Sequence, residues 1–155
     1  MAVTVNPYLN FRGQAREAID FYQSVFGGEV HASTFAEAGM PVDPSEADWI
    51  MHSQLATPNG IVVMVSDAPS SMGAGELHNG AISISGPAED EAVITEYWNK
   101  LSEGATITAE FARAPWGDLF GMLDDRFGVS WLIDVVAPAG ETDGLGVEPP
   151  PKSQL

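Results

Sequence analysis

The strongest constraint on the fold is that one order of secondary-structure patterns occurs twice along the chain. A strand pattern is followed by a helix pattern and by three more strand patterns, and the same order begins again roughly 70 residues later. Residue by residue the copies are only weakly alike, although GIVVMVSD (60–67) is similar to GVSWLIDV (128–135), and Tyr22 and Trp98 hold similar helix positions. This repeat predicts two modules of one fold, each built as strand–helix–strand–strand–strand.

The first copy begins with residues 4–11, which alternate polar and apolar side chains as a half-buried strand does. The helix pattern that follows ends at the Gly27-Gly28 pair, a common helix stop. Its apolar residues fall on one face at helical spacing: Ala15, Ala18, Ile19, Tyr22, Val25 and Phe26. The sequences EVHASTFAE, WIMHSQLAT and GIVVMVSDA predict three strands, with a tight turn at PNG (58–60) between the last two.

The second copy runs from the strand pattern GAISISG (80–86) through the helix pattern AEDEAVITEYWNKLSEGA to three strand patterns, TITAEFARA, LFGMLDD and GVSWLIDVV. The apolar residues of this helix are Val93, Ile94, Tyr97, Trp98 and Leu101. We therefore predict a first module over 1–68, a linker over 69–79 and a second module over 80–138. The Pro- and Gly-rich tail over 139–155 is predicted to be disordered.

Composition excludes several classes of function. The 155 residues contain no cysteine, which rules out disulfides and thiolate chemistry. Six Lys and Arg stand against 22 Asp and Glu, a net charge of −16, so nucleic acid and anionic membranes are not expected as partners. No apolar run reaches the ~18 residues of a membrane span, and the N-terminus lacks the features of a signal peptide, so we expect a cytoplasmic protein. The acidity favours solubility, and the alternative is a role in steering cationic ligands.

Five local motifs carry a family resemblance: PYLNF, AIDFYQSVFGGEV, IMHSQL, VMVSDA and WGDLFGMLDDRFGVSWLID. With the paired repeat, they make residues 4–137 similar to the vicinal oxygen chelate superfamily (glyoxalase, bleomycin resistance and dioxygenase proteins), and in particular to its PhnB-like branch. The resemblance implies an α+β fold in which paired βαβββ modules form a cupped, glyoxalase-like mixed sheet. It also implies a homodimer.

The same resemblance implies where a metal would bind, because metal-dependent members hold one divalent ion with His, Glu or Gln from the first and last strands of each module. Carried over one by one, those positions hold Pro7 or Tyr8, Met64, Ala81 and Leu132. This set offers almost no suitable oxygen or nitrogen donor. We therefore expect neither a metal nor another cofactor, which argues against the enediolate chemistry of the superfamily.

Members of this branch are often described as demethylubiquinone methyltransferases or as DNA-binding proteins. A methyl-donor site of the usual kind would need a glycine-rich turn between a strand and a helix, and the sequence has none. DNA binding conflicts with the net charge.

His52 is the first candidate for catalysis, because its imidazole suits general acid or base chemistry and it lies mid-strand on the same predicted face as Ile50 and Gln54. Asp134 is the second, on a face shared with Ser130. The alternatives are that His52 is hydrogen-bonded within the sheet and that Asp134 satisfies backbone groups at a strand end. The predicted ligand-binding set comprises Tyr8, Asn10, Met64, Ser66, Ser83, Trp116, Phe120 and Leu132, with Trp116 and Phe120 as an aromatic lip over a mostly apolar pocket.

The charged run Asp124-Asp125-Arg126 is predicted to form the turn of the last hairpin, with solvent-facing side chains. It is therefore not expected to be catalytic.

Three functions are compatible with these patterns. The preferred one is a metal-free protein that binds a small organic ligand in its cup, with catalysis left open. One alternative is a metal-dependent enzyme of the glyoxalase or dioxygenase type, with ligands such as His52 and Asp134. The other is a non-catalytic dimerisation or interaction module whose cup is filled by Met64 and Leu132.

Overall fold

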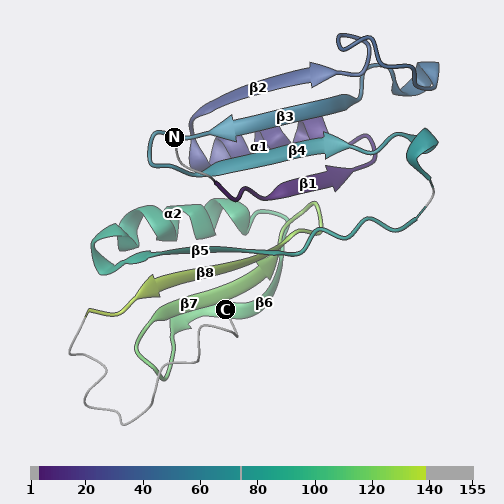
Figure 1. The fold of residues 1–155 in the computed structure, drawn as a ribbon. Helices are drawn as coiled ribbons and strands as arrows, with labels where there is room; N and C mark the ends of the chain where they lie inside the picture. Colours follow the sequence, from purple (N-terminus) through teal and green to yellow (C-terminus); the bar gives the residue numbers. More distant parts are fainter. Residues whose placement is uncertain (1–3, 74, 139–155) are drawn as a thin grey trace. The chain divides into compact units, whose positions relative to one another are not determined.

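The computed structural model describes residues 4–73 and 75–138, and the chain divides into two compact units, Met1–Asn79 and Gly80–Leu155. Each unit contains a strand, a helix and three further strands in that order (Figure 1). Each sheet is mixed, four-stranded and open, which confirms the α+β class and the paired βαβββ modules. The predicted tail over 139–155 lies outside the described residues.

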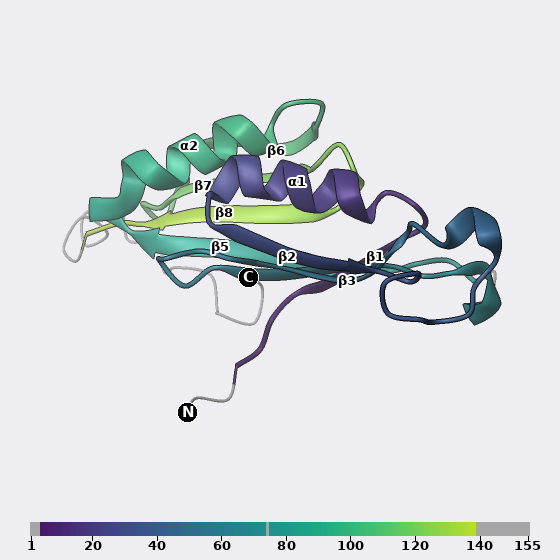
Figure 2. The same ribbon diagram turned by 90° about the horizontal axis from the view of Figure 1, so that it is seen from above.

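Unit 1 has a sheet in the order β1-β4-β3-β2, in which β1 runs parallel to β4 and the other neighbours are antiparallel. Its helix covers one side of the sheet (Figure 2). The elements are β1 (Tyr8–Phe11), α1 (Ala15–Phe26), β2 (Glu29–Thr34), β3 (Ile50–Ala56) and β4 (Val62–Asp67), with short 3-10 helices at η1 (Pro44–Glu46) and η2 (Ser70–Met72). The first strand is shorter than predicted, because residues 4–7 carry no regular structure and Pro7 has no N–H to donate to a ladder.

The start of α1 is fixed by Asp67, at the end of β4. Its Oδ1 accepts hydrogen bonds from the backbone N–H groups of Gly13 (2.7 Å) and Ala15 (3.1 Å), while Oδ2 accepts one from Ile50 (3.0 Å). A carboxylate is favourable there because the first N–H groups of a helix lack partners within it. One buried acid therefore ties the helix to two strands. All six apolar residues predicted for this helix face are buried.

A β-bulge interrupts the pairing of β3 with β2. Ser33 pairs with His52 but Thr34 pairs with Ile50, so β3 carries one extra residue at this point. Such a residue breaks the strict alternation of side chains. Ile50 is accordingly buried, at 1% exposure, whereas His52 is only half-buried. The predicted common face of His52 and Ile50 therefore ends at the bulge, while that of His52 and Gln54 is retained.

The outer edge of β1 is partly closed by a side chain. Asn79 accepts a hydrogen bond from the Asn10 backbone N–H (2.9 Å) and donates one to the Asn10 carbonyl (3.0 Å). The amide of Asn79 thus makes the two bonds that a neighbouring strand would make with this residue.

Unit 2 repeats the arrangement with the order β5-β8-β7-β6 and with β5 parallel to β8. Its elements are β5 (Ala81–Pro87), η3 (Ala88–Asp90), α2 (Glu91–Leu101), β6 (Thr106–Arg113), β7 (Leu119–Asp124) and β8 (Ser130–Val136). Ile94, Tyr97, Trp98 and Leu101 are buried as the helix pattern predicts, but Val93 is 45% exposed. Trp98 stacks on Phe111 of β6, with ring centroids 5.0 Å apart.

The turn between β7 and β8 contains the charged run Asp124-Asp125-Arg126, and the prediction that all three side chains face solvent is wrong for Asp125. This acid is 4% exposed and accepts hydrogen bonds from the backbone N–H groups of Phe127 and Val129 and from the indole of Trp131. Without this carboxylate, the two backbone N–H groups and the indole N–H would lack an acceptor, and this explains why Asp125 is buried. Asp125 therefore holds the turn together.

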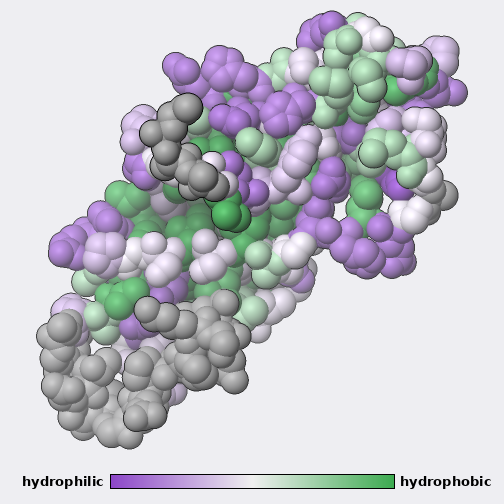
Figure 3. Space-filling view, in the orientation of Figure 1, coloured by the Kyte–Doolittle hydropathy of each residue, from purple (hydrophilic) through white to green (hydrophobic). Residues whose placement is uncertain are grey.

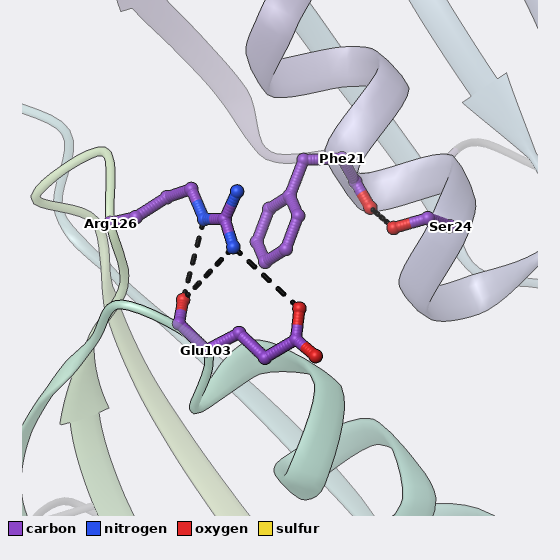
Figure 4. Close-up of polar contacts among 4 residues, drawn as sticks. All are labelled: Phe21, Ser24, Glu103 and Arg126. Atoms are coloured by element: carbon purple, nitrogen blue, oxygen red, sulfur yellow. Dashed lines mark hydrogen bonds and ion pairs between the residues drawn. The ribbon is translucent and has the colours of Figure 1, made fainter.

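Arg126, from the same turn, reaches the segment after α2. Its guanidinium donates to the Glu103 carbonyl (3.3 Å) and lies 3.6 Å from the Glu103 carboxylate (Figure 4). Figure 4 also draws a contact within α1 of unit 1, where the Ser24 hydroxyl donates to the Phe21 carbonyl (2.6 Å).

No helix among the described residues is both long and apolar enough to cross a membrane.

Candidate functional site

The side of each sheet turned away from its helix, called here the open face, carries the predicted site residues. In unit 2 this assignment follows from two glycines: a side chain built on Gly86 or on Gly121 would meet α2, at Ile94 and Trp98 respectively. Side chains alternate along a strand, so the neighbouring residues Ser85 and Phe120 point to the opposite side. Asp134 pairs with both of them in the sheet register and shares the open face.

Asp134 is the most unusual titratable group described. It is 4% exposed, and its Oδ1 has no hydrogen-bond partner among the described residues. Burial, the charge of Asp118 and a hydrogen bond with that residue raise the pKa of Asp134 to about 6, while Ser85 acts in the opposite direction. A carboxyl in this position exchanges a proton close to neutral pH, which is the property expected of a catalytic or ligand-binding acid.

Asp118 lies in the loop between β6 and β7 and is the second acid of the pair. Its Oδ1 accepts a hydrogen bond from the Ala137 backbone N–H (2.8 Å), and its Oδ2 accepts one from the Trp116 indole (3.2 Å). Both of its oxygens therefore have donors, in contrast to Oδ1 of Asp134. Sequence patterns did not single out Asp118, because the contact depends on how the loop folds back over β8.

The two aromatic residues predicted as a lip over a ligand pocket contact one another within unit 2. Trp116 and Phe120 meet edge to face with ring centroids 5.6 Å apart. At the same end of the sheet a hollow of about 470 Å³ is lined by Pro87, Ala88, Glu89, Val136, Ala137 and Pro138. Because Asp118 holds the N–H of Ala137, the hollow and the acid pair adjoin one another. In the view of Figure 3, apolar residues gather over unit 2.

The pairing of β5 with β8 determines which serine lies beside Asp134. Ser83 pairs with Leu132, and it is Ser85 that pairs with Asp134. Ser83 and Leu132 thus lie side by side on the open face, two residues along from the acid pair. The parallel register is set by the whole sheet, so local sequence alone does not show that Ser85 is the serine beside Asp134.

In unit 1 the open face brings together Tyr8 and His52. The Tyr8 hydroxyl and His52 Nδ1 are 3.2 Å apart, and the rings meet edge to face with centroids 5.6 Å apart. Tyr8 is 48% exposed, so this pair is accessible to solvent. Which group donates depends on the imidazole tautomer.

A second polar pair lies beside it. The Ser66 hydroxyl donates to Oδ1 of Asn10 (2.9 Å), and Met64 pairs with Tyr8 in the sheet register. The register also confirms the repeat, because Asn10 and Ser66 pair in unit 1 as Ser85 and Asp134 pair in unit 2. Ser66 and Asp134 are therefore equivalent positions, although only one of them is an acid.

The two predicted catalytic residues belong to different units. Each has a partner within its own unit, Tyr8 for His52 and Asp118 for Asp134. Each unit therefore carries one candidate proton-transfer group with a partner of its own.

The donor chemistry does not fit a superfamily-type metal ion. The register places Tyr8 beside Met64, whereas the carried-over Ala81 pairs with Ser130 and it is Ser83 that lies beside Leu132. The carried-over residues Tyr8, Met64, Ala81 and Leu132 supply one hydroxyl, one thioether and two alkyl groups, and Ser83 adds only a second hydroxyl. Among the residues that the structure describes, no group of three or more His, Cys, Asp or Glu could hold a metal.

Comparison with known proteins supports one family. A model of the family described as 3-demethylubiquinone-9 3-methyltransferase matches residues 3–134. Protein YjdN of Escherichia coli is 26% identical over 144 residues, which cover 85% of this chain and 95% of that protein.

Two solved structures have the same fold. Protein PA1353 from Pseudomonas aeruginosa is 29% identical, with a TM-score of 0.75, over 88% of this chain and all of that one. The PhnB protein from Bacillus cereus is 27% identical, with a TM-score of 0.65, over 86% of this chain and all of that one.

Proposed function

The chain belongs to the family described as 3-demethylubiquinone-9 3-methyltransferase, in the PhnB-like branch of the vicinal oxygen chelate superfamily, and from this premise we propose that it binds a small organic ligand without a metal. The proposed site is the open face of unit 2, at the Asp118–Asp134 pair. Methyl transfer, which the family description names, is not part of the proposal, because the chain lacks a recognisable methyl-donor site.

One observation carries the proposal: Asp134 is a buried carboxyl with an oxygen that nothing described satisfies. An unsatisfied buried acceptor costs on the order of 1–3 kcal/mol, so folding alone gives no reason to keep it. An acceptor of this kind is useful to a protein when a ligand completes it. The neighbouring hollow and the aromatic pair Trp116 and Phe120 supply the apolar surroundings that small-molecule sites usually have.

The site has a means of proton exchange that needs no metal. With its pKa near 6, Asp134 is present in both protonation states around neutral pH, as a general acid or base must be. Asp118, held by two donors, stabilises the proton on its neighbour through its own charge. In unit 1, His52 with Tyr8 is the second proposed proton-transfer group, because an imidazole has one nitrogen that can donate and one that can accept a proton.

The remaining ligand-binding residues are proposed by position. Ser83 and Leu132 extend the open face of unit 2, and Asn10, Met64 and Ser66 form that of unit 1 beside the Tyr8–His52 pair. A cytoplasmic location and a homodimer belong to the same proposal, the second by family resemblance.

The proposal is tested by titrating small organic molecules of cationic, neutral and anionic classes into the protein while recording its proton–nitrogen NMR spectrum. The indole N–H of Trp116 is the reporter, because it contacts Asp118 directly. We expect some of these molecules to move this signal saturably and to leave the Trp131 indole, which is held by Asp125 in the turn, in place. A panel that moves neither the Trp116 signal nor the amides of residues 85 and 134 would contradict the proposal.

Elemental analysis of protein purified without a chelator distinguishes the metal-free proposal from the metal-dependent alternative. The expected result is less than about 0.1 divalent ion per chain, since the carried-over positions offer too few donors. A stoichiometric ion that is lost in a His52→Ala or Asp134→Asn variant would overturn the metal-free proposal in favour of that alternative.

A further inference from the structure

Building on the proposed site, we propose that the Asp118–Asp134 pair selects organic cations: a protonated amine attached to an aromatic or apolar group. This inference rests on the proposed function and specifies the class of ligand. Hydrogen bonding, charge and ring geometry each support it separately.

The first support is the free acceptor. Both oxygens of Asp118 already accept hydrogen bonds, from Ala137 N–H and from the Trp116 indole, whereas Oδ1 of Asp134 accepts none from the described residues. A ligand that completes the site must therefore bring a donor to Asp134. An ammonium N–H is the strongest such donor, because a charge-assisted hydrogen bond is roughly twice as strong as a neutral one.

The second support is the sign of the charge. The groups that act on Asp134 are Asp118 and Ser85, and no Lys or Arg is among them. Arg113, at the end of β6 beside this loop, directs its guanidinium to the Gly117 carbonyl (2.9 Å). Glu89 lines the adjoining hollow, and the whole chain carries −16. Such surroundings attract a cation and repel an anion.

The third support is the aromatic pair. Trp116 and Phe120 lie edge to face beside the acids, and the negative face of an aromatic ring attracts an ammonium group. Acids and aromatic rings together bind both ends of an arylalkylamine, with the nitrogen at Asp134 and the apolar part against the rings or in the hollow. A neutral molecule gains only the second contact.

Binding of a cation should also release a proton. The positive charge favours the ionised form of Asp134, so bound ligand and bound proton compete for this carboxyl. Below the pKa of the free site, the affinity for a cation therefore falls as the pH falls. A neutral ligand carries no such coupling.

Three probes of the same shape test the inference: benzylamine, benzyl alcohol and benzoate, which are cationic, neutral and anionic at neutral pH. Dissociation constants are measured from the Trp116 indole signal. The expected result is binding of benzylamine at least tenfold tighter than that of benzyl alcohol, corresponding to about 1.4 kcal/mol, with benzoate weakest. In wild type, the affinity for benzylamine should fall about tenfold between pH 7 and pH 5.

The matched variants are Asp134→Asn, which removes the titrating acceptor, and Asp124→Asn, which removes a carboxylate from the same open face. Asp124 pairs with Ser130, four residues along the ladder from the pair of Asp134 with Phe120, or about 13 Å away. We expect Asp134→Asn to abolish the preference for benzylamine and its pH dependence, while Asp124→Asn changes the affinity less than twofold. The indole signals of Trp49, Trp98 and Trp131 report whether each variant is folded.

Equal binding of benzylamine and benzyl alcohol, or tighter binding of benzoate, would overturn the cation inference and leave the proposed small-molecule function standing. Equal losses in Asp134→Asn and Asp124→Asn would also overturn it, because the preference would then reflect net charge alone. If no class of probe reaches the Trp116 signal, the proposed function fails together with the inference. The wild-type pH dependence decides the matter even if Asp134→Asn does not fold.

Discussion

At the residue scale, three acids of unit 2 differ in how completely their carboxyl oxygens are hydrogen-bonded. Asp125 is buried and fully occupied by three donors, while Asp134 is equally buried and has an oxygen with none. Asp124, half-buried, accepts a single bond from the Ser130 hydroxyl (2.6 Å). Asp125 therefore stabilises a turn, whereas Asp134 keeps one acceptor oxygen that no described residue occupies. Three substitutions distinguish these roles.

Substituting Asp134→Asn should change how stability depends on pH. The folded pKa of about 6 lies above the ordinary 3.8, so the folded chain holds this proton more tightly than the unfolded chain does. The stability that this proton confers is complete below about pH 4 and is lost as the pH rises through about 6. We expect the variant to gain about 1–3 kcal/mol relative to wild type between pH 4 and pH 7.5, as measured by urea unfolding. A constant difference across this range would show that Asp134 titrates normally.

Substituting Asp125→Ala should destabilise the fold by about 2–4 kcal/mol, because it leaves two backbone N–H groups and one buried indole without an acceptor. The neighbouring Asp124→Ala loses only the bond from Ser130 and should cost about 1 kcal/mol. Urea unfolding of both variants checks the comparison. Equal costs would mean that the turn does not depend on the buried acid.

Much of the site at this scale could not be derived from sequence. Asp134 and Phe120 lie on one face of unit 2, as period-two alternation along paired strands implies, and Trp116 reaches Phe120 from the loop before β7. Asp118 was missed, since its contact with Asp134 is made by an irregular loop with no periodicity to reveal it. His52 and Asp134, the two candidates for catalysis, each have a partner in their own unit, Tyr8 and Asp118 respectively.

At the scale of elements, periodicity predicted the order of strands and helices, because apolar spacing of two or near four residues reflects burial directly. It did not predict the bulge that separates Ile50 from His52, which depends on the pairing of β3 with β2. It also placed Val93 on the buried face of α2, where the structure leaves it exposed. Ends and irregularities depend on tertiary contacts, so local patterns describe them poorly.

Close packing of α2 on its sheet depends on Gly121 in β7. A Cβ at this position would lie 2.8 Å from the Trp98 ring and 2.9 Å from the Phe111 Cα. We expect Gly121→Ala to destabilise unit 2 by about 1–3 kcal/mol, since the ring cannot retreat without breaking its stack on Phe111. Thermal or urea unfolding measures this. Gly80→Ala, where a Cβ meets nothing within 4 Å, is the control and should be close to neutral.

At the scale of the whole molecule, the two units carry different chemistry on the same scaffold. Unit 1 offers a Tyr–His pair and a Ser–Asn pair, whereas unit 2 offers two carboxyls next to aromatic rings. A repeat preserves the positions of backbone and core while its surface residues diverge. The order of strands and helices in both units was therefore predictable from the sequence, and the ligand was not.

Oligomeric state is the prediction that belongs to this scale. By family resemblance, we expect light scattering at micromolar concentration to give twice the mass of one chain. A mass of one chain under the same conditions would contradict the homodimer. Because the net charge is −16, the measurement should be made at about 0.15 M salt, where repulsion between copies is screened beyond about 8 Å.

Exposed strand edges are where β-sheet proteins recruit further chains and begin to aggregate. Asn79 occupies the outward N–H and C=O of Asn10 and so acts as a cover over the edge of β1. An Asn79→Ala variant should therefore form fibrillar or amorphous aggregates sooner than wild type under gentle heating, as followed by turbidity. One amide side chain in the connection between the modules would then protect the protein against misassembly as well as holding a loop in place.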